Sequence, residues 1–340
     1  GASGAPKLRI ALLLATPGSG WGGMEKHCTE LAQELVELGH DVHVLAHSNY
    51  QDKFPEPVRF HPCPMTLGRR NPWLRWKLRR TLQHIRPNIV HAHGNKAATL
   101  AAQTKQPYWQ TIGTIHGTKS SVRAFDSLDK VIAVSQAIYN QIQHPRKYLI
   151  YNGVKQPDSS PVTFPLKGFI KVVAAGRLEP VKGFDKLIQA WERVCYITPE
   201  AHLTIFGDGS LKGQLNELVK SHGLINSVTL AGFHTDIGSI LQSADLLVIS
   251  SEREGFPYIL AEALVAGCPV ISTPVSGCRE LLPDTALASD NTTEAIAELL
   301  SSAIENIDAL RESQEELFRY ANTHLTSGAM AGSTVAAYQA

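Results

Sequence analysis

The sequence predicts an α/β protein made of two doubly wound parallel-sheet domains. Its 340 residues are enough for about two domains at the usual ~100–200 residues each. With 43% hydrophobic and 19% charged residues, the chain has ample material for packed cores. Short apolar runs alternate with longer amphipathic segments in both halves, which is the order of βα units in a parallel sheet covered by helices. We expect a ligand cleft between the carboxyl ends of the two sets of strands.

The first domain is predicted over residues 7–155 and begins with a buried strand at Arg9–Ala15. This apolar run is short and is followed by glycines instead of a small-residue cleavage site, which argues against a signal peptide. Helical spacing of apolar residues predicts a helix over Met24–Leu38, which Gly39 ends. The further predicted strands are Asp41–Ala46, Ile89–His91, Ile112–His116 and Lys130–Val134.

The second domain is predicted over residues 168–320, after a proline-containing linker at residues 156–167. Its predicted strands are Lys171–Ala175, His202–Phe206, Ser227–Ala231, Leu246–Ile249 and Pro269–Ser272. Its predicted helices are Phe184–Tyr196, Leu211–Ser221 and Tyr258–Ala266. Residues 321–340 are expected to form a helical tail, and residues 1–6 are left out of the predicted fold.

The net charge of +1 conceals an asymmetry between the two halves. Residues 1–160 carry 20 Lys and Arg against 10 Asp and Glu, whereas residues 161–340 carry 12 against 21. The basic excess is densest in the segment Arg69–Arg80, where two tryptophans interleave with six cations. We predict that this segment contacts anionic membrane lipid. The alternative is an ordinary surface helix whose Trp73 and Trp76 pack inward; nucleic acid is not an expected partner, because no recognisable binding module accompanies the segment.

Cysteine usage and hydropathy predict the compartment. The five cysteines are an odd number without a C-x-x-C pair, which argues against a disulfide scaffold or a zinc ribbon. No uncharged apolar run approaches the ~18–20 residues that span a bilayer. We therefore expect a cytoplasmic protein that is at most peripheral on the inner face of the cytoplasmic membrane.

The glycine-rich stretch Gly18–Gly23 satisfies the G-x-G-x-x-G pattern of dinucleotide-binding loops. That function also requires an acidic residue at the end of the second strand, where this chain has Val44-Leu-Ala-His-Ser48 instead. NAD is therefore not an expected cofactor. We expect Gly22 and Gly23 to let an anion or a sugar approach the backbone at the start of a helix.

Two loops of the second domain carry residues suited to a nucleotide diphosphate. Gly176-Arg-Leu-Glu-Pro-Val-Lys-Gly183 follows a predicted strand and supplies Arg177 and Lys182, which can neutralise a diphosphate or can simply be solvated. In Glu252-Arg-Glu-Gly-Phe-Pro-Tyr-Ile-Leu-Ala-Glu262, a helix starting near Pro257 leaves Glu254 on the preceding loop. A phosphate is favoured at such a helix start, although the helix dipole alone also favours an acidic residue there.

Together these motifs resemble the retaining glycosyltransferases of family 4 (glycosyltransferase group 1), which have the GT-B fold of two Rossmann-like domains facing across a cleft. The resemblance lies in the E-x7-E pair, the Gly176–Gly183 loop and Gly22-Gly-x-Glu25, and it runs from about residue 8 to about residue 320. Further family-like segments are Tyr151–Val154, Phe206–Gly209, Leu230–Phe233, Ala266–Val270 and Gly277–Glu280. Cys278 and Pro257 replace residues that are frequently glycine in the family, which bears on the identity of the donor.

The resemblance implies a role for each candidate site residue. Glu254 would hold the transferred sugar and His116 would lie near its reactive face, so these two are the candidate catalytic residues. Arg177 and Lys182 would bind the diphosphate, and Glu262 the ribose. The expected donor-binding residues are Gly23, Arg177, Lys182, Phe256, Pro257, Tyr258, Ile259 and Glu262. From the residues alone, His116 could equally be a core histidine.

No metal or other cofactor is predicted. The chain has no D-x-D pair at the candidate donor site, and Arg177, Lys182 and the helix start would meet the charge of the leaving group. His91 and His93 could suggest a metal site, but we expect their side chains on opposite sides of the strand and interpret them as structural or acceptor-side residues.

The sequence thus predicts a metal-independent hexosyltransferase acting in bacterial surface polysaccharide or lipopolysaccharide synthesis. A UDP- or GDP-linked sugar would bind the second domain, and a glycan or lipid-linked acceptor the first. The family implies retention by front-face attack, with Glu254 as a covalent nucleophile the alternative. The other candidate functions are a nucleotide-sugar 2-epimerase of the same architecture, a sugar phosphorylase and a non-catalytic sugar-nucleotide-binding subunit.

Overall fold

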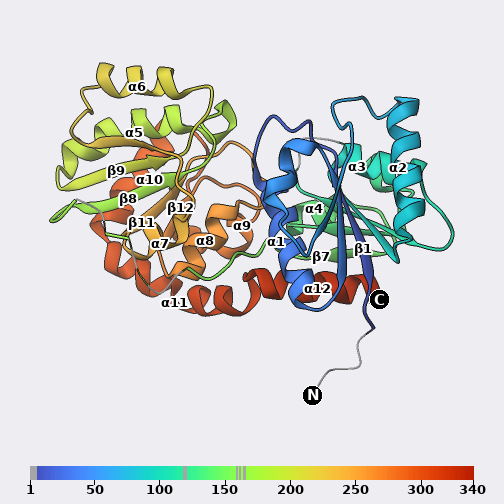
Figure 1. The fold of residues 1–340 in the computed structure, drawn as a ribbon. Coiled ribbons are helices and arrows are strands. Elements are labelled where there is room, and N and C mark those ends of the chain that lie inside the picture. Colours follow the sequence, from blue (N-terminus) through green and yellow to red (C-terminus); the bar gives the residue numbers. More distant parts are fainter. Residues whose placement is uncertain (1–5, 118–120, 158–159, 161, 164–165) are drawn as a thin grey trace. The chain divides into compact units, whose positions relative to one another are not determined.

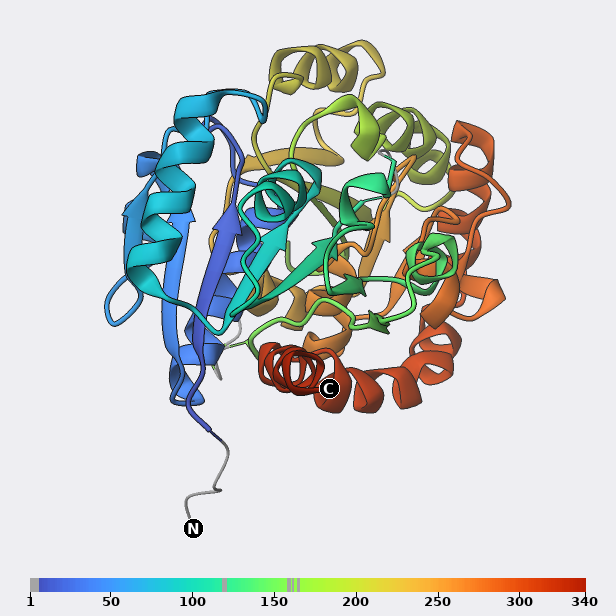
Figure 2. The same ribbon diagram turned by 90° about the vertical axis from the view of Figure 1, so that its right-hand side faces the viewer.

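The computed structural model describes the chain except residues 1–5, 118–120, 158–159, 161 and 164–165 (Figure 1). It divides into two compact units, one comprising the chain up to Asn152 together with Ser327–Ala340, the other Gly153–Thr326. Each unit contains one parallel sheet with helices on both faces, as Figures 1 and 2 show. The predicted fold class is therefore confirmed. Part of the linker predicted at residues 156–167 lies outside the described residues.

The first unit is built on a seven-stranded sheet in the order β3-β2-β1-β4-β5-β6-β7. Its strands are β1 Arg9–Leu14, β2 Asp41–Ala46, β3 Arg59–Pro62, β4 Ile89–His93, β5 Gln110–Ile115, β6 Lys130–Ala133 and β7 Lys147–Leu149. Its α-helices are α1 Gly23–Glu37, α2 Pro72–Ile85, α3 Asn95–Gln103, α4 Gln136–Gln141 and α12 Ser327–Gln339. The edge strands β3 and β7 were not predicted, because both are short and mostly half-buried and so lack a continuous apolar run.

The C-terminal helix α12 is part of the core of the first unit. Its Met330 and Tyr338 belong to the same buried cluster as Leu12 of β1 and Leu31 of α1. The fully buried amine of Lys130 donates hydrogen bonds to the carbonyl oxygens of Ala337, Tyr338 and Ala340 at 2.7–3.1 Å. These bonds occupy carbonyl groups that have no partner within a helix at its C-terminal end.

The second unit has a five-stranded sheet in the order β10-β9-β8-β11-β12. Its strands are β8 Ile170–Ala175, β9 Ala201–Phe206, β10 Val228–Gly232, β11 Leu246–Ile249 and β12 Val270–Ser272. Its α-helices are α5 Phe184–Ile197, α6 Lys212–Ser221, α7 Ile237–Gln242, α8 Tyr258–Ala266, α9 Cys278–Leu281, α10 Thr293–Glu305 and α11 Ile307–His324. Helix α5 packs against α6 and α10, and α8 against α7 and α11.

Both sheets have a topological switch point, where the strand order reverses. In the first sheet it lies between β1 and β4, and in the second between β8 and β11. In open α/β sheets, ligands bind beyond the carboxyl ends of the strands at such points. These two places are therefore where each unit is expected to carry a site. No helix among the described residues is long and apolar enough to cross a membrane.

Candidate functional sites at the two switch points

An ion pair joins the two loops at the switch point of the second unit. Lys182 ends a short 3₁₀ helix after β8, and Glu254 lies on the loop between β11 and α8. The Lys182 Nζ is 2.8 Å from Glu254 Oε1, and Ser251 Oγ donates to the same oxygen at 2.8 Å. The two side chains are 27% and 13% exposed, so the pair is reachable from solvent but partly desolvated. The structure thus brings together a predicted phosphate ligand and a predicted sugar ligand.

The backbone of the loop after β8 approaches the backbone of the loop after β11 closely at Gly183. This residue has φ +68°, and a Cβ atom there would lie 2.1 Å from the carbonyl oxygen of Ser250. The Ser250 hydroxyl in turn donates to the Lys182 carbonyl oxygen at 2.8 Å. Only glycine fits this conformation and this close approach, so Gly183 sets the distance between Lys182 and the β11 loop.

Helix α8 begins directly beside Glu254. Pro257 is its N-cap residue, which confirms the predicted start of the helix, and Glu262 is its fifth residue. Phe256 is buried. Tyr258 and Ile259, in the first turn, are half-buried. The positive end of the α8 dipole therefore lies close to the Lys182–Glu254 pair and favours negative charge there.

Arg177 has a different partner from Lys182. Its Nε is 2.9 Å from Glu179 Oε1 on the same loop, and both side chains are well exposed. The structure therefore places Arg177 after β8 as expected but pairs it with a neighbouring carboxylate. Its predicted contact with a diphosphate stays a prediction.

The glycine pair of the first unit starts helix α1. Gly22 is the N-cap, and its N–H donates to the Glu25 carboxylate at 3.0 Å, as in a capping box. Gly23 is the first, exposed residue of the helix. The Gly-Gly-x-Glu motif therefore has a structural role in α1 whatever it binds.

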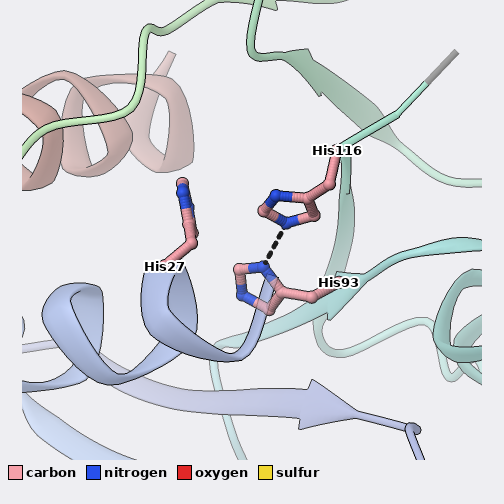
Figure 3. A group of neighbouring side chains, drawn as sticks. All are labelled: His27, His93 and His116. Atoms are coloured by element: carbon pink, nitrogen blue, oxygen red, sulfur yellow. Dashed lines mark hydrogen bonds between the residues drawn. The ribbon is translucent and has the colours of Figure 1, made fainter. Parts of the chain in front are cut away.

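Three histidines cluster at the switch point of the first unit (Figure 3). His27 comes from α1, His93 ends β4, and His116 follows β5. His93 is paired in register with Thr114, so His116 lies two residues further along the neighbouring strand. The His93 Nδ1 is 3.1 Å from His116 Nε2, and the rings of His27 and His116 are 4.6 Å apart between centroids.

The expectation for His91 and His93 is wrong in one respect. Their rings stack on the same side of the sheet with centroids 4.3 Å apart, because residues two positions apart on a strand share a face. The His91 nitrogens lie 2.6 Å from the hydroxyl oxygens of Tyr338 and Thr114. His91 therefore has a structural role, which ties β4 to α12.

Burial keeps the histidine cluster neutral. Desolvation lowers the pKa of His27 to about 4, although its hydrogen bond to Asn152 at 2.8 Å acts in the opposite direction. Desolvation, followed by the neighbouring imidazoles, holds the pKa values of His93 and His116 well below the ordinary range. All three rings are therefore uncharged at pH 7 and can donate or accept hydrogen bonds.

The same three histidines are the group of described residues whose geometry could hold a metal ion. Each offers a ring nitrogen, and these atoms all lie within 4.8 Å of one another. Neutral imidazoles suit divalent zinc, copper or iron. His93 and His116 are hydrogen-bonded to each other, however, and a ligand set of three imidazoles would leave the charge of the ion uncompensated.

Several site residues were missed by the sequence analysis. His27, Asn152 and Ser251 were not predicted as part of a site, and His93 was interpreted only as a structural or acceptor-side residue. A signal existed for His93, because it ends a strand as His116 nearly does, and parallel strands end at the same sheet edge. Asn152 lies in the family-like segment Tyr151–Val154, but nothing in the sequence indicates that it meets His27 across 125 positions.

Two family models match most of the chain. The model described as Glycosyltransferase Family 4 matches residues 21–156, and that described as Glycosyl transferases group 1 matches residues 156–323.

Curated relatives and solved structures span a similar extent. The phosphatidylinositol N-acetylglucosaminyltransferase gpi3 subunit of Schizosaccharomyces pombe is 28% identical over 324 residues, covering 83% of this chain and 70% of its own. Glycogen synthase of Mycobacterium tuberculosis is 27% identical over 76% of each chain. The structure of HepE from Anabaena with UDP and glucose shares the fold, with a TM-score of 0.81, 20% identity, and 98% and 99% of the two chains covered.

Proposed function

Because the chain belongs to the group 1 glycosyltransferases of the GT-B type, we propose that it transfers a sugar from a nucleotide diphosphate to an acceptor hydroxyl with retention of configuration. The observation that carries the proposal is the Lys182–Glu254 pair beside the start of α8. It combines a cation and a helix dipole for phosphate with a carboxylate for sugar hydroxyls. All three lie at the switch point of the second sheet.

The leaving diphosphate would be stabilised electrostatically, without a metal. Lys182 is held in place by Glu254, so it can meet developing negative charge with little reorganisation. Arg177 is the second cation on the same loop, and Glu262, one turn into α8, would accept hydrogen bonds from ribose hydroxyls. The departing phosphate would take the acceptor proton in a front-face reaction.

The surroundings of Glu254 favour a sugar-holding role over a covalent nucleophile. Its Oε1 accepts hydrogen bonds from both Lys182 and Ser251. Two donors on one carboxylate oxygen stabilise its charge and reduce its tendency to form a bond to carbon. We assign His116 to the sugar as a neutral hydrogen-bonding group.

UDP-linked sugars are the first donors to test. Structures of Anabaena HepE are described as complexes with UDP and with UDP-glucose. GDP-linked donors remain the alternative. The relatives named above act on different acceptors by name, so we keep a glycan or lipid-linked acceptor, in bacterial surface polysaccharide or lipopolysaccharide synthesis, as the proposed class.

Helix α2 supports a peripheral contact with anionic lipid at the cytoplasmic membrane face. Its apolar face, with Leu74, Leu78 and Leu82, is buried in the first unit, whereas Trp73 and Trp76 are 55% and 50% exposed. The tryptophans therefore do not pack inward. They lie among the cations of the Arg69–Arg80 segment, an arrangement typical of interfacial helices.

Ligand-induced thermal stabilisation tests the donor site. UDP, GDP, ADP and their sugar conjugates are compared with and without chelator, and a ligand at ~100 times its Kd stabilises by about 2.7 kcal/mol. We expect one nucleotide to stabilise the wild type and the Lys186→Met control, whose amine pairs with Glu252 instead, but to lose its effect on Lys182→Met. Equal stabilisation of both variants would contradict the phosphate site.

Product analysis separates the reaction classes. Incubation with the stabilising nucleotide sugar should release nucleoside diphosphate only with an acceptor, with the sugar transferred in its original anomeric configuration. An isomeric nucleotide sugar formed without acceptor would instead indicate an epimerase. Binding without either product from any acceptor would indicate a non-catalytic subunit.

A further inference from the structure

The hydrogen bond between His93 and His116 couples the protonation of the two rings. Its ends are His93 Nδ1 and His116 Nε2, 3.1 Å apart, and Figure 3 shows the second nitrogen of His116 on the side of the ring away from His93. One nitrogen of this pair must carry a hydrogen and the other a lone pair. Each ring therefore dictates the tautomer of the other.

Both rings are neutral, so each has one N–H group to place. Beyond desolvation, the charges of described residues that act on His93 and His116 are those of other histidines, among them His27 on α1 and His91 on β4. Protonating either ring would add a charge to a buried cluster whose neighbours are also imidazoles, which is unfavourable.

The surroundings of His93 decide the direction of the bond. Its other nitrogen, Nε2, is buried and has no hydrogen-bond partner among the residues that the structure describes. If that atom carried the hydrogen, a buried N–H donor would be left unsatisfied, and such donors are rarer in folded proteins than underused acceptors. The hydrogen of His93 is therefore favoured on Nδ1, where it is used in the bond to His116.

We propose that His93 is a positioning residue that fixes His116 as its Nδ1–H tautomer, so that His116 presents a hydrogen-bond donor to an oxygen of the bound sugar. His93 is buried, whereas His116 is partly exposed at the end of β5. The nature of the ligand rests on the proposed function; the tautomer does not. A donor at this position binds a sugar hydroxyl and does not remove a proton through Nδ1, which agrees with the leaving phosphate taking the acceptor proton.

The tautomers can be measured on the ligand-free protein. In long-range 15N–1H spectra of histidine-labelled protein, we expect His116 with a protonated Nδ1 and an unprotonated Nε2, and His93 with a protonated Nδ1. A 15N–15N coupling across the hydrogen bond should connect His93 Nδ1 and His116 Nε2. A protonated Nε2 on His116 would overturn the proposal without any variant being made.

Two substitutions of His93 separate positioning from packing. In His93→Asn the amide nitrogen takes nearly the place of Nδ1 and can still donate, whereas His93→Phe keeps a ring and removes the donor. We expect His93→Asn to keep the His116 tautomer, and His93→Phe to let Nε2 become protonated with kcat roughly tenfold lower. An unchanged His116 tautomer in folded His93→Phe would overturn the role of His93.

The spectra also keep this proposal distinct from the proposed function. If no nucleotide sugar is turned over but the Nδ1–H tautomer and the coupling are found, only the function fails. If turnover is found and His116 carries its hydrogen on Nε2, only the positioning role fails.

Discussion

The side chains at the switch point of the second sheet are charged and partly exposed, whereas those at the switch point of the first sheet are neutral and mostly buried. Lys182 and Glu254 form an ion pair that solvent can reach. Desolvation is the main cause that lowers the pKa values of His27, His93 and His116, so these rings are uncharged. One fold class can therefore place a charged pair and a neutral histidine cluster at equivalent positions.

The largest expected effect concerns stability at acid pH, which should depend on the histidine cluster at the first switch point. The pKa of His27 falls from 6.5 in the unfolded chain to about 4 in the folded protein. Between those values the unfolded state binds the extra proton, so the free energy of unfolding should fall as the pH drops from about 6.5 towards 4. For His27 alone this amounts to on the order of 3 kcal/mol.

Denaturant unfolding at a series of pH values measures the slope of the free energy of unfolding against pH. His27→Gln should flatten it, whereas the same change at the exposed His324 should not. A slope that is unaffected by His27→Gln would mean that other groups cause the acid sensitivity.

The substitution Lys182→Met removes the cation of the Lys182–Glu254 pair at the second switch point. Charge-assisted contacts are typically ~1.5–3 kcal/mol, so kcat/KM for the nucleotide sugar should fall roughly 10- to 100-fold. Lys186→Met, which removes the neighbouring Lys186–Glu252 pair at 3.2 Å, is the matched control and should change kcat/KM by less than about twofold. Similar losses in both variants would show that general positive potential matters more than the position of Lys182.

Gly183→Ala tests whether the backbone approach positions the charged pair. The new Cβ would collide with the Ser250 carbonyl in a positive-φ conformation, so we expect a loss of about 2 kcal/mol in unfolding free energy and weaker nucleotide binding. Gly213→Ala is the control, because nothing lies within 4 Å of its Cβ position in helix α6. That change should stabilise slightly. Wild-type stability of Gly183→Ala would contradict the close approach.

The smallest expected effect is that of metal removal, which tests whether the three histidines at the first switch point hold an ion. Dialysis against a chelator should leave kcat within about twofold, because Lys182 and the α8 dipole are proposed to meet the charge of the leaving group. Metal analysis before and after dialysis is the companion measurement. Loss of activity that added zinc restores, and that His27→Gln abolishes, would indicate that the three histidines hold an ion.

The sequence predicted the second site better than the first. Lys182, Glu254 and the start of α8 were found because loop motifs, a proline and a strand end are local features of the chain. The histidine cluster was only partly found, since His116 was predicted, His27 was not, and His93 was assigned to the wrong relation with His91. Its members come from α1, the end of β4 and the residue after β5, and the register of β4 and β5 brings His93 close to His116.

From the sequence alone we predicted the α/β class and most strands and helices correctly, and we identified the residues to which the proposed chemistry of the second unit is assigned. Hydrophobic periodicity and the conformational preferences of glycine and proline are properties of a few neighbouring residues, so they can be recognised in the sequence. Only the tertiary structure decided that Lys182 pairs with Glu254, that three histidines share one buried site, and that α12 joins the first core. These outcomes depend on desolvation and on contacts across as many as 293 positions of sequence, which exist only once the sheets have formed.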